Sequence, residues 1–263
     1  RPRRPAGEAA LTLPAPGEIA ILFGAGIVGG LINTLAGGGS FLLVPLLVMM
    51  GLPATVANAT SRVGVFAQSL SAVAGFRQEG FRDLDTALRI LPVMLLAAWL
   101  GAALASSLDD EIFARGFGAV MLLALPLILW NPRPRTDAAT RAPLAPALQH
   151  AIYFAIGLYG GAIQAGVGIP LTLALVGVGR LDLVRASSVK VAINTATTAI
   201  ALAQFAWAGK VVWGHGLLLA VGMALGGYAG SRVGARAGDR LLRPALTVCV
   251  VLLAIRMLLG GSG

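Results

Sequence analysis

The chain has 263 residues, of which 57% are hydrophobic and 12% are charged, and its formal net charge at pH 7 is +9. A soluble domain carries about 25% charged residues, so this composition excludes a protein whose whole surface faces water. The arginines gather in short segments between apolar stretches, so we interpret them as membrane-topology signals and expect no nucleic-acid partner. One cysteine, Cys249, and two histidines do not form the clusters that hold metals, so no metal site or other cofactor is expected.

Apolar stretches of membrane-spanning character recur along the whole chain and predict an all-α polytopic membrane protein in a lipid bilayer. We expect a flexible tail over residues 1–17, which contain three arginines and four prolines. A first membrane unit should cover residues 18–130, a polar linker residues 131–147, and a second unit residues 148–259. The predicted apolar segments are 18–36, 40–50, 56–76, 87–107 and 112–130, then 148–165, 169–178, 186–207, 212–231 and 241–259.

The two units align with each other at an offset near 130 residues. Gly29-Gly30 matches Gly160-Gly161, and Asn33 matches Gln164. Farther along, the stretch 57–63 matches 185–191. Because polar positions recur in the same order within otherwise apolar strings, we predict an internal duplication of two homologous repeats.

Two topologies are compatible with this duplication. The pieces 40–50 and 169–178 are about 15 Å long as helices, against a hydrocarbon core of about 30 Å. Each piece either continues an interrupted crossing, which gives parallel repeats, or returns to its own side as a hairpin, which gives inverted repeats. Inverted repeats place the four arginine-richest loops together in the cytoplasm, as the positive-inside rule requires. We therefore predict inverted halves, each with a broken, re-entrant helical hairpin plus three spanning helices.

A polar, glycine-rich break interrupts the first unit at Gly37-Gly38-Gly39-Ser40, and a looser one lies at residues 164–170. Ser40 is predicted to cap the following short helix, and Pro170 suits a first helical turn. Helix N-termini attract anions, and broken segments in corresponding positions of two halves indicate a transport site. The alternative is that the glycines only allow close helix crossing, which we favour for Gly29 and Gly30.

Two cations, Arg62 and Lys190, lie inside predicted helices at matching positions of the two repeats. A charge at membrane depth is costly and indicates function, although each side chain could instead reach a membrane interface. Hydroxyl and amide side chains flank both cations, which suits binding of an oxyanion. The acidic residues all fall at segment ends or in loops, so neither a cation-coupling site nor catalysis is expected.

The residues expected to bind substrate share these breaks and the flanks of the two cations. They are Asn33, Thr34, Gly37, Gly38, Gly39, Ser40, Asn58, Ser61, Arg62, Gln164, Gly168, Ser187, Ser188, Lys190 and Asn194.

From about residue 18 onward the sequence resembles the TauE/SafE family of sulfite or organosulfonate exporters. The resemblance rests on Gly29-Gly30, on the run from Gly39 to Pro45, on residues 57–62 and on the weaker second copy. It implies transport of small sulfur-containing anions such as sulfite or sulfoacetate across a bacterial inner membrane. The second copy departs from the pattern, because Val167-Gly168-Ile169-Pro170 replaces a full glycine run.

We therefore expect a multi-pass inner-membrane exporter of a small anion, driven by the membrane potential. Three alternatives stay open: an uptake permease or channel-like facilitator for another small anion, a membrane enzyme, and a cation or metal transporter. Homodimer formation is also left open.

Overall fold

The computed structural model describes residues 14–81, 84–130 and 144–234, and within these ranges all regular structure is helical. This confirms the predicted all-α class. Most of the expected tail and linker, the segment 241–259 and Cys249 lie outside the described residues. The helices are α1 Pro16–Ala36, α2 Ser40–Met49, α3 Ala54–Gln78, α4 Leu84–Ser107, α5 Asp110–Trp130, α6 Pro146–Ala162, α7 Gly168–Gly177, α8 Leu183–Trp207 and α9 Trp213–Gly234.

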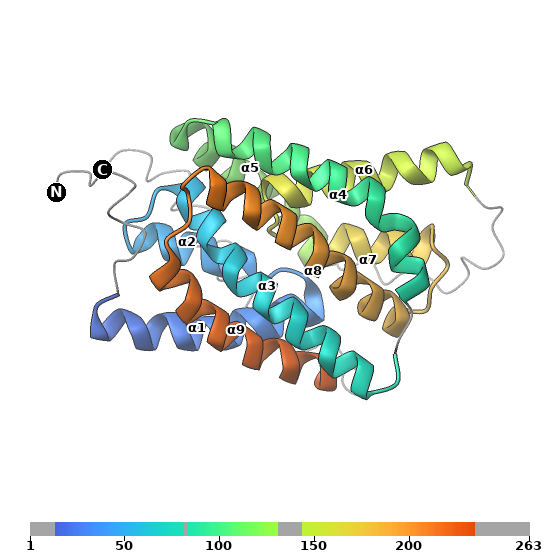
Figure 1. The fold of residues 1–263 in the computed structure, drawn as a ribbon, viewed down its shortest axis with the longest axis horizontal. Coiled ribbons are helices and arrows are strands. Elements are labelled where there is room, and N and C mark those ends of the chain that lie inside the picture. The colour runs from blue at the N-terminus through green and yellow to red at the C-terminus, as the bar shows by residue number, and fades with distance from the viewer. Residues whose placement is uncertain (1–13, 82–83, 131–143, 235–263) are drawn as a thin grey trace.

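The short helices α2 and α7 each follow a break after a longer helix. At the first break, Gly37 has a φ of 78°, and its N–H donates to the carbonyl of Asn33, which ends α1. Such a left-handed residue is the common glycine terminator of a helix. The chain then turns back through α2 to the start of α3, which lies at the same end of the molecule as the start of α1 (Figure 1). The α1–α2 unit is therefore a hairpin.

The fourth helix of each predicted half packs against the other half. Helix α9 lies along α1 and α3, whereas α4 lies along α6 and α8. The α1–α9 crossing is lined by glycines at a spacing of four, where an added Cβ would lie 3.0 Å or less from backbone of the other helix: Gly26, Gly30, Gly222 and Gly226. Small residues at this spacing let helix backbones approach closely, which is how helices associate in lipid.

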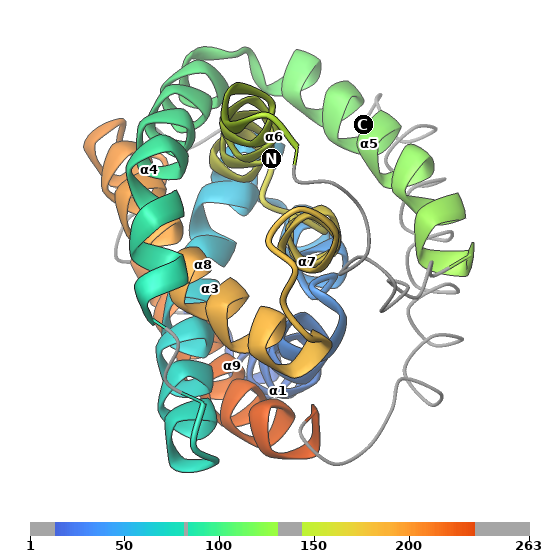
Figure 2. The same ribbon diagram turned by 90° about the vertical axis from the view of Figure 1, so that its right-hand side faces the viewer.

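The direction of each helix follows from its neighbours. The N–H of Val212, just before α9, donates to Thr60 near the start of α3, and Gly75 meets Ser231 near the ends of both helices, so α3 and α9 run parallel. Helices α1 and α9 also run parallel, and so do α4 and α6. In contrast, α3 and α8 cross in opposite directions, because Arg62 lies on the ring of Phe205 and, farther along α3, Ser69 is bonded to the earlier α8 residue Asn194. Figure 2 shows α7 near the middle of the bundle, with α6 on one side and α1 on the other.

Among the described residues, four helices are long and apolar enough to span a membrane: α1, α4, α8 and α9. Their outward faces carry large exposed apolar side chains, such as Ile21, Leu104 and Leu225. Helix α3 is as long as α8 and carries many polar residues, and all of those between Thr55 and Ser69 are buried. An apolar outside around a polar central helix is the arrangement expected of a bundle in lipid.

Candidate functional site

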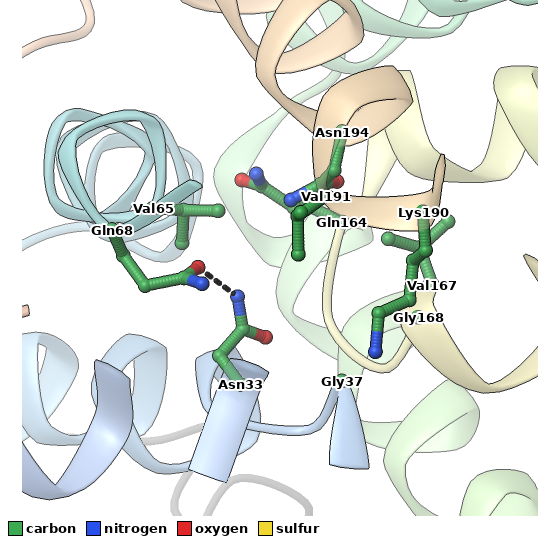
Figure 3. Close-up of a pocket in the computed structure, with 10 residues that line it drawn as sticks. All are labelled: Asn33, Gly37, Val65, Gln68, Gln164, Val167, Gly168, Lys190, Val191 and Asn194. Atoms are coloured by element: carbon green, nitrogen blue, oxygen red, sulfur yellow. Dashed lines mark hydrogen bonds between the residues drawn. The ribbon is translucent and has the colours of Figure 1, made fainter. Parts of the chain in front are cut away.

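The centre of the bundle holds a small cavity where α3 and α8 cross. Val65 of α3 and Asn194 of α8 both line it, and each is the twelfth residue of a helix of 25 residues. The cavity therefore lies midway along both central helices. Its lining is drawn in Figure 3: Asn33, Gly37, Val65, Gln68, Gln164, Val167, Gly168, Lys190, Val191 and Asn194.

The two helix breaks touch each other at this cavity. A Cβ added to Gly168 would lie 2.5 Å from the Cα of Gly37, and one added to Gly37 would lie 2.5 Å from the Cα of Gly168. Real Cβ atoms do not approach so closely, so both positions require glycine. The end of α1 is thereby pressed against the start of α7. The cavity volume is about 10 Å³, about the space that one water molecule needs.

Amide side chains from α1, α3 and the break after α6 hold the walls together. Gln68 donates through Nε2 to the hydroxyl of Thr34 at 2.6 Å and accepts through Oε1 from Nδ2 of Asn33 at 2.7 Å. Across the cavity, Gln164 donates to the hydroxyl of Thr198 at 2.9 Å. The other amide atom of Gln164, Oε1, is buried and has no hydrogen-bond partner among the described residues. It leaves one acceptor that a ligand or a water molecule can satisfy.

Lys190 is the only ionisable residue among the ten described residues that line the cavity. Its side chain is 4% exposed, and its ammonium group donates to the carbonyl of Thr34 at 3.2 Å. In Figure 3 the chain of Lys190 extends toward Gly37. The positive charge therefore lies next to the point where the two breaks meet.

Arg62 is fully buried but does not line this cavity. Its guanidinium donates to three carbonyls in the last turn of α6, those of Gly160 at 3.1 Å, Gly161 at 2.7 Å and Ala162 at 3.2 Å. It also lies 4.8 Å from the ring centroid of Phe205. A cation at the C-terminal end of a helix is stabilised by the helix dipole and satisfies carbonyls that lack intrahelical partners. Arg62 therefore ties α3 to the end of α6.

The predicted site residues separate into those that line the cavity and those that lie elsewhere. The cavity brings together Asn33, Gly37, Gln164, Gly168, Lys190 and Asn194. Thr34 lies behind this wall, bonded to Gln68. The remaining residues are outside the lining: Gly38, Gly39, Ser40, Asn58, Ser61, Arg62, Ser187 and Ser188.

Several of the residues outside the lining have structural partners. Asn58 donates to the carbonyl of Ala162, which also accepts from Arg62. The hydroxyls of Ser61 and Ser187 bond to carbonyls of their own helices. The predicted capping role of Ser40 is wrong: Gly39 precedes the helix with helical backbone angles, and the Ser40 hydroxyl has no partner among the described residues. An N-cap residue has a non-helical backbone, which lets its side chain accept from the N–H groups of the first turn that follows.

Four cavity residues were absent from the predicted set. Gln68 was recognisable as a polar residue inside a helix, but sequence alone does not separate a cavity amide from one that joins two helices. Val65, Val167 and Val191 give no signal, because a valine at a cavity and a valine in the core look alike in sequence.

Comparison with known proteins gives the class of this chain, a membrane transporter. It is 26% identical to a probable membrane transporter protein, ORF9, of Sinorhizobium sp, with 91% of this chain and 92% of the relative aligned. It is 27% identical to a probable membrane transporter protein of Haemophilus influenzae, covering 91% of this chain and 94% of the relative. It is 23% identical to the probable membrane transporter protein YfcA of Escherichia coli K12, over 96% and 94% of the two chains.

The model of one protein family, described as sulfite exporter TauE/SafE, matches residues 22–257. The chain belongs to this family, which confirms the resemblance seen in its sequence. No solved structure matches the chain.

Proposed function

We propose that this protein exports a small sulfur-containing oxyanion, such as sulfite, sulfoacetate or a related organosulfonate, across the bacterial inner membrane. The observation that carries the proposal is the position of Lys190, a buried cation in the wall of a mid-bundle cavity where two helix breaks meet. A charge buried at membrane depth is costly and is retained where it pairs with a partner or a substrate. The family model described as sulfite exporter TauE/SafE matches residues 22–257, which is most of the chain.

We also propose that the two halves are inverted repeats. Helices α1, α3 and α9 run in one direction, and α3 runs opposite to α8. Helix α8 packs along α4, which runs parallel to α6. The predicted counterparts α3 and α8 are therefore antiparallel, and Gly37 and Gly168, which are 131 positions apart, meet at the centre. Equivalent positions of the two predicted repeats thus contact each other, which supports a site formed equally by two inverted halves.

Transport requires the breaks to separate. A volume of about 10 Å³ does not admit an oxyanion with four heavy atoms, so the contact between Gly37 and Gly168 must open on one side before substrate enters. A protein that opens to each side in turn moves its substrate without a continuous pore. The cavity described here corresponds to the closed step of such a cycle.

The membrane potential is sufficient to drive export of an anion. With the cytoplasm negative, moving one negative charge outward releases about 2.3 kcal/mol per 100 mV. Lys190 places a positive charge in the cavity wall, and none of the ten described lining residues carries a carboxylate, thiol or imidazole. A positive charge in the wall attracts an anion and repels a cation. This favours an anion transporter over a cation transporter for the same cavity.

The test is anion efflux from proteoliposomes that contain the full chain. Sulfite loaded inside should leave faster when an imposed voltage makes the interior negative, and Lys190→Met should slow this efflux at least about tenfold, the effect of losing roughly 1.4 kcal/mol. Lys210→Met is the matched control, because Lys210 is the other lysine of the chain and lies in the turn between α8 and α9. Efflux that ignores voltage, or that Lys190→Met leaves unchanged, contradicts the proposal. Faster uptake than efflux at zero voltage assigns the site to an importer instead.

A further inference from the structure

We propose that Lys190 is a latch as well as a ligand-binding residue. In the closed step its ammonium holds the end of α1 through the carbonyl of Thr34, and a bound anion takes the place of this carbonyl. This inference rests on the proposed function and adds to it how substrate binding is coupled to opening. It follows from the partners of Lys190, from the matching contact of Arg62, and from the two groups of helices that these contacts join.

The first observation is how the end of α1 is capped. The last four carbonyls of a helix have no partner within the helix. Gly37 donates its N–H to the carbonyl of Asn33, and the ammonium of Lys190 donates to that of Thr34 at 3.2 Å. A cation at this end is also favoured by the helix dipole. Lys190 is therefore occupied in the closed step, by this carbonyl and by a further interaction.

The second observation is that Arg62 makes the matching contact at the other break. Lys190 of α8 holds the end of α1, and Arg62 of α3 holds the last three carbonyls of α6. Because the two cations occupy matching positions of the predicted repeats, each half holds the broken helix of the other half. Arg62 is the ninth residue of α3 and Lys190 the eighth of α8, and these helices are antiparallel. The two cations therefore lie toward opposite ends of the bundle.

The third observation concerns the helices that these contacts join. Helix α9 packs along α1 and α3, whereas α4 packs along α6 and α8, which gives two groups of closely packed helices. Lys190 and Arg62 each reach from one group to the other, and the contact of Gly37 with Gly168 also joins α1 to the second group through α7. Opening therefore requires one group to move against the other, and each cation restrains one end of the bundle.

The hydroxyl of Thr34 indicates which contacts stay with α1 when it moves. This hydroxyl accepts from Gln68 at 2.6 Å and donates to the carbonyl of Gly30 at 3.0 Å. Both bonds lie within the group that contains α1 and α3. Lys190 belongs to the other group, so the same movement breaks its bond to the Thr34 carbonyl. The end of α1 thus moves with α3 and away from α8.

An oxyanion and the Thr34 carbonyl compete for the same ammonium. Opposite full charges attract more strongly than an ammonium attracts a neutral carbonyl. The anion reaches Lys190 only after the breaks have separated, so its binding stabilises the open step relative to the closed one. Sulfite and sulfoacetate both present an oxyanion group, so the coupling covers both. Without substrate, the carbonyl keeps the buried ammonium hydrogen-bonded, which allows the empty protein to close.

Distance measurements between two gadolinium spin labels test the latch on the full chain in lipid nanodiscs. In a Cys249→Ala background, Ala74→Cys on α3 and Leu183→Cys on α8 place one label on each group, near the end that Lys190 restrains. Both positions are exposed, and thioether attachment makes the labels resistant to sulfite. Sulfite should raise the population of the longer distance at least about threefold. Lys210→Met should leave this response unchanged.

Lys190→Met separates a latch from a residue that only binds the ligand. Without any anion, the variant should populate the longer distance at least about threefold more than the unchanged protein, and sulfite should add nothing. A closed distance in the variant without sulfite, equal to that of the unchanged protein, overturns the latch. Thermal unfolding verifies that the variant folds. If it does not fold, the response of the unchanged protein to sulfite decides.

Sulfite efflux from proteoliposomes separates this inference from the proposed function. Voltage-driven export of sulfite by a protein whose label distance does not respond to sulfite overturns the latch and leaves the exporter standing. A folded protein that neither exports sulfite nor responds to it contradicts both. A shift to the longer distance with sulfite, together with a Lys190→Met variant that is open from the start, supports the latch.

Discussion

The two buried cations of this protein differ in what they touch. The guanidinium of Arg62 is held by three backbone carbonyls and an aromatic ring, with none of the side chain exposed. The ammonium of Lys190 donates to the backbone carbonyl of Thr34 at the edge of the cavity. Arginine offers five donors in a fixed fork, which suits a set of carbonyls, whereas lysine is a compact charge on a flexible stem. Arg62 therefore stabilises the helix break, and the proposed role of Lys190 is to present charge to a ligand.

Because of this difference, substitution of Arg62 should lower stability, whereas substitution of Lys190 should slow transport. Arg62→Gln should lower the free energy of unfolding by about 1.5–3 kcal/mol, because hydrogen bonds to a charged donor are lost and carbonyls stay buried. The measurement is thermal unfolding of the purified chain in detergent. Arg115→Gln is the control, since Arg115 forms an exposed pair with Glu111 that is worth at most about 1 kcal/mol. An Arg62→Gln protein as stable as the control, yet unable to bind an anion, would show that Arg62 is a ligand.

Asn33, Gln164, Lys190 and Asn194 were predicted as site residues because each is a polar residue in an apolar string. The structure gathers them around one cavity, and their part in substrate binding stays a prediction. The partners of Arg62 could not be predicted, because they are backbone carbonyls, which every residue has and no pattern marks. The polar residues around Arg62 were grouped with it by proximity in sequence, although a helix presents neighbouring residues to different sides.

At the scale of the element, the two broken hairpins matter most. Their short helices were predicted within a residue or two, because glycine and proline mark helix ends strongly. The contact between the two breaks could not be predicted, since they lie far apart in the chain and meet only through tertiary packing. The predicted starts of α3 and α8 were two to three residues late, because the sequence marks the ends of a helix less strongly than its existence.

The contact between the breaks predicts the effect of one added methyl group. Gly168→Ala should slow transport strongly, because its Cβ would lie 2.5 Å from the Cα of Gly37 and the closed step could not form. Gly177→Ala, at the other end of α7, has open space around its added Cβ and should behave as the unchanged protein. The measurement is the rate of sulfite efflux from proteoliposomes, with thermal unfolding to verify folding. Full activity of Gly168→Ala would mean that the breaks do not close during transport.

At the scale of the whole molecule, charge separates the two ends of the bundle. Arg77, Arg180, Arg185 and Arg232 lie at the end where α3, α7 and α9 finish and α8 begins. The opposite end, where α4 meets α5, holds the acidic Asp109, Asp110 and Glu111 (Figure 1). Because positive loops stay in the cytoplasm, the basic end is expected to face inward.

Cysteine labelling tests this orientation with the two ends of one helix. Helix α8 has 25 residues and is about 37 Å long, enough to cross the hydrocarbon core. In a Cys249→Ala background, Ala208→Cys should react with a membrane-impermeant maleimide added to intact spheroplasts. Leu183→Cys should react only after the membrane is opened. The reverse pattern would mean that the acidic end faces the cytoplasm.

Within the described residues, the number of helices and the two breaks follow from hydropathy and glycine content, but the packing of α4 and α9, each against the other predicted half, does not. Which helix packs on which depends on matching glycine surfaces, such as those of α1 and α9, and many apolar strings carry glycine. Pairing is therefore decided by complementary shape in three dimensions, which a linear pattern of residues does not contain.

The exchange of α4 and α9 also bears on how the protein is made. A chain leaves the ribosome from its N-terminus, so α1 and α3 enter the bilayer long before α9, against which both pack. During that interval the glycine groove of α1 and the side of α3 that later packs on α9 lack this neighbour. Assembly of the described helices in the bilayer therefore includes a step in which α9 packs against α1 and α3 after both are in place.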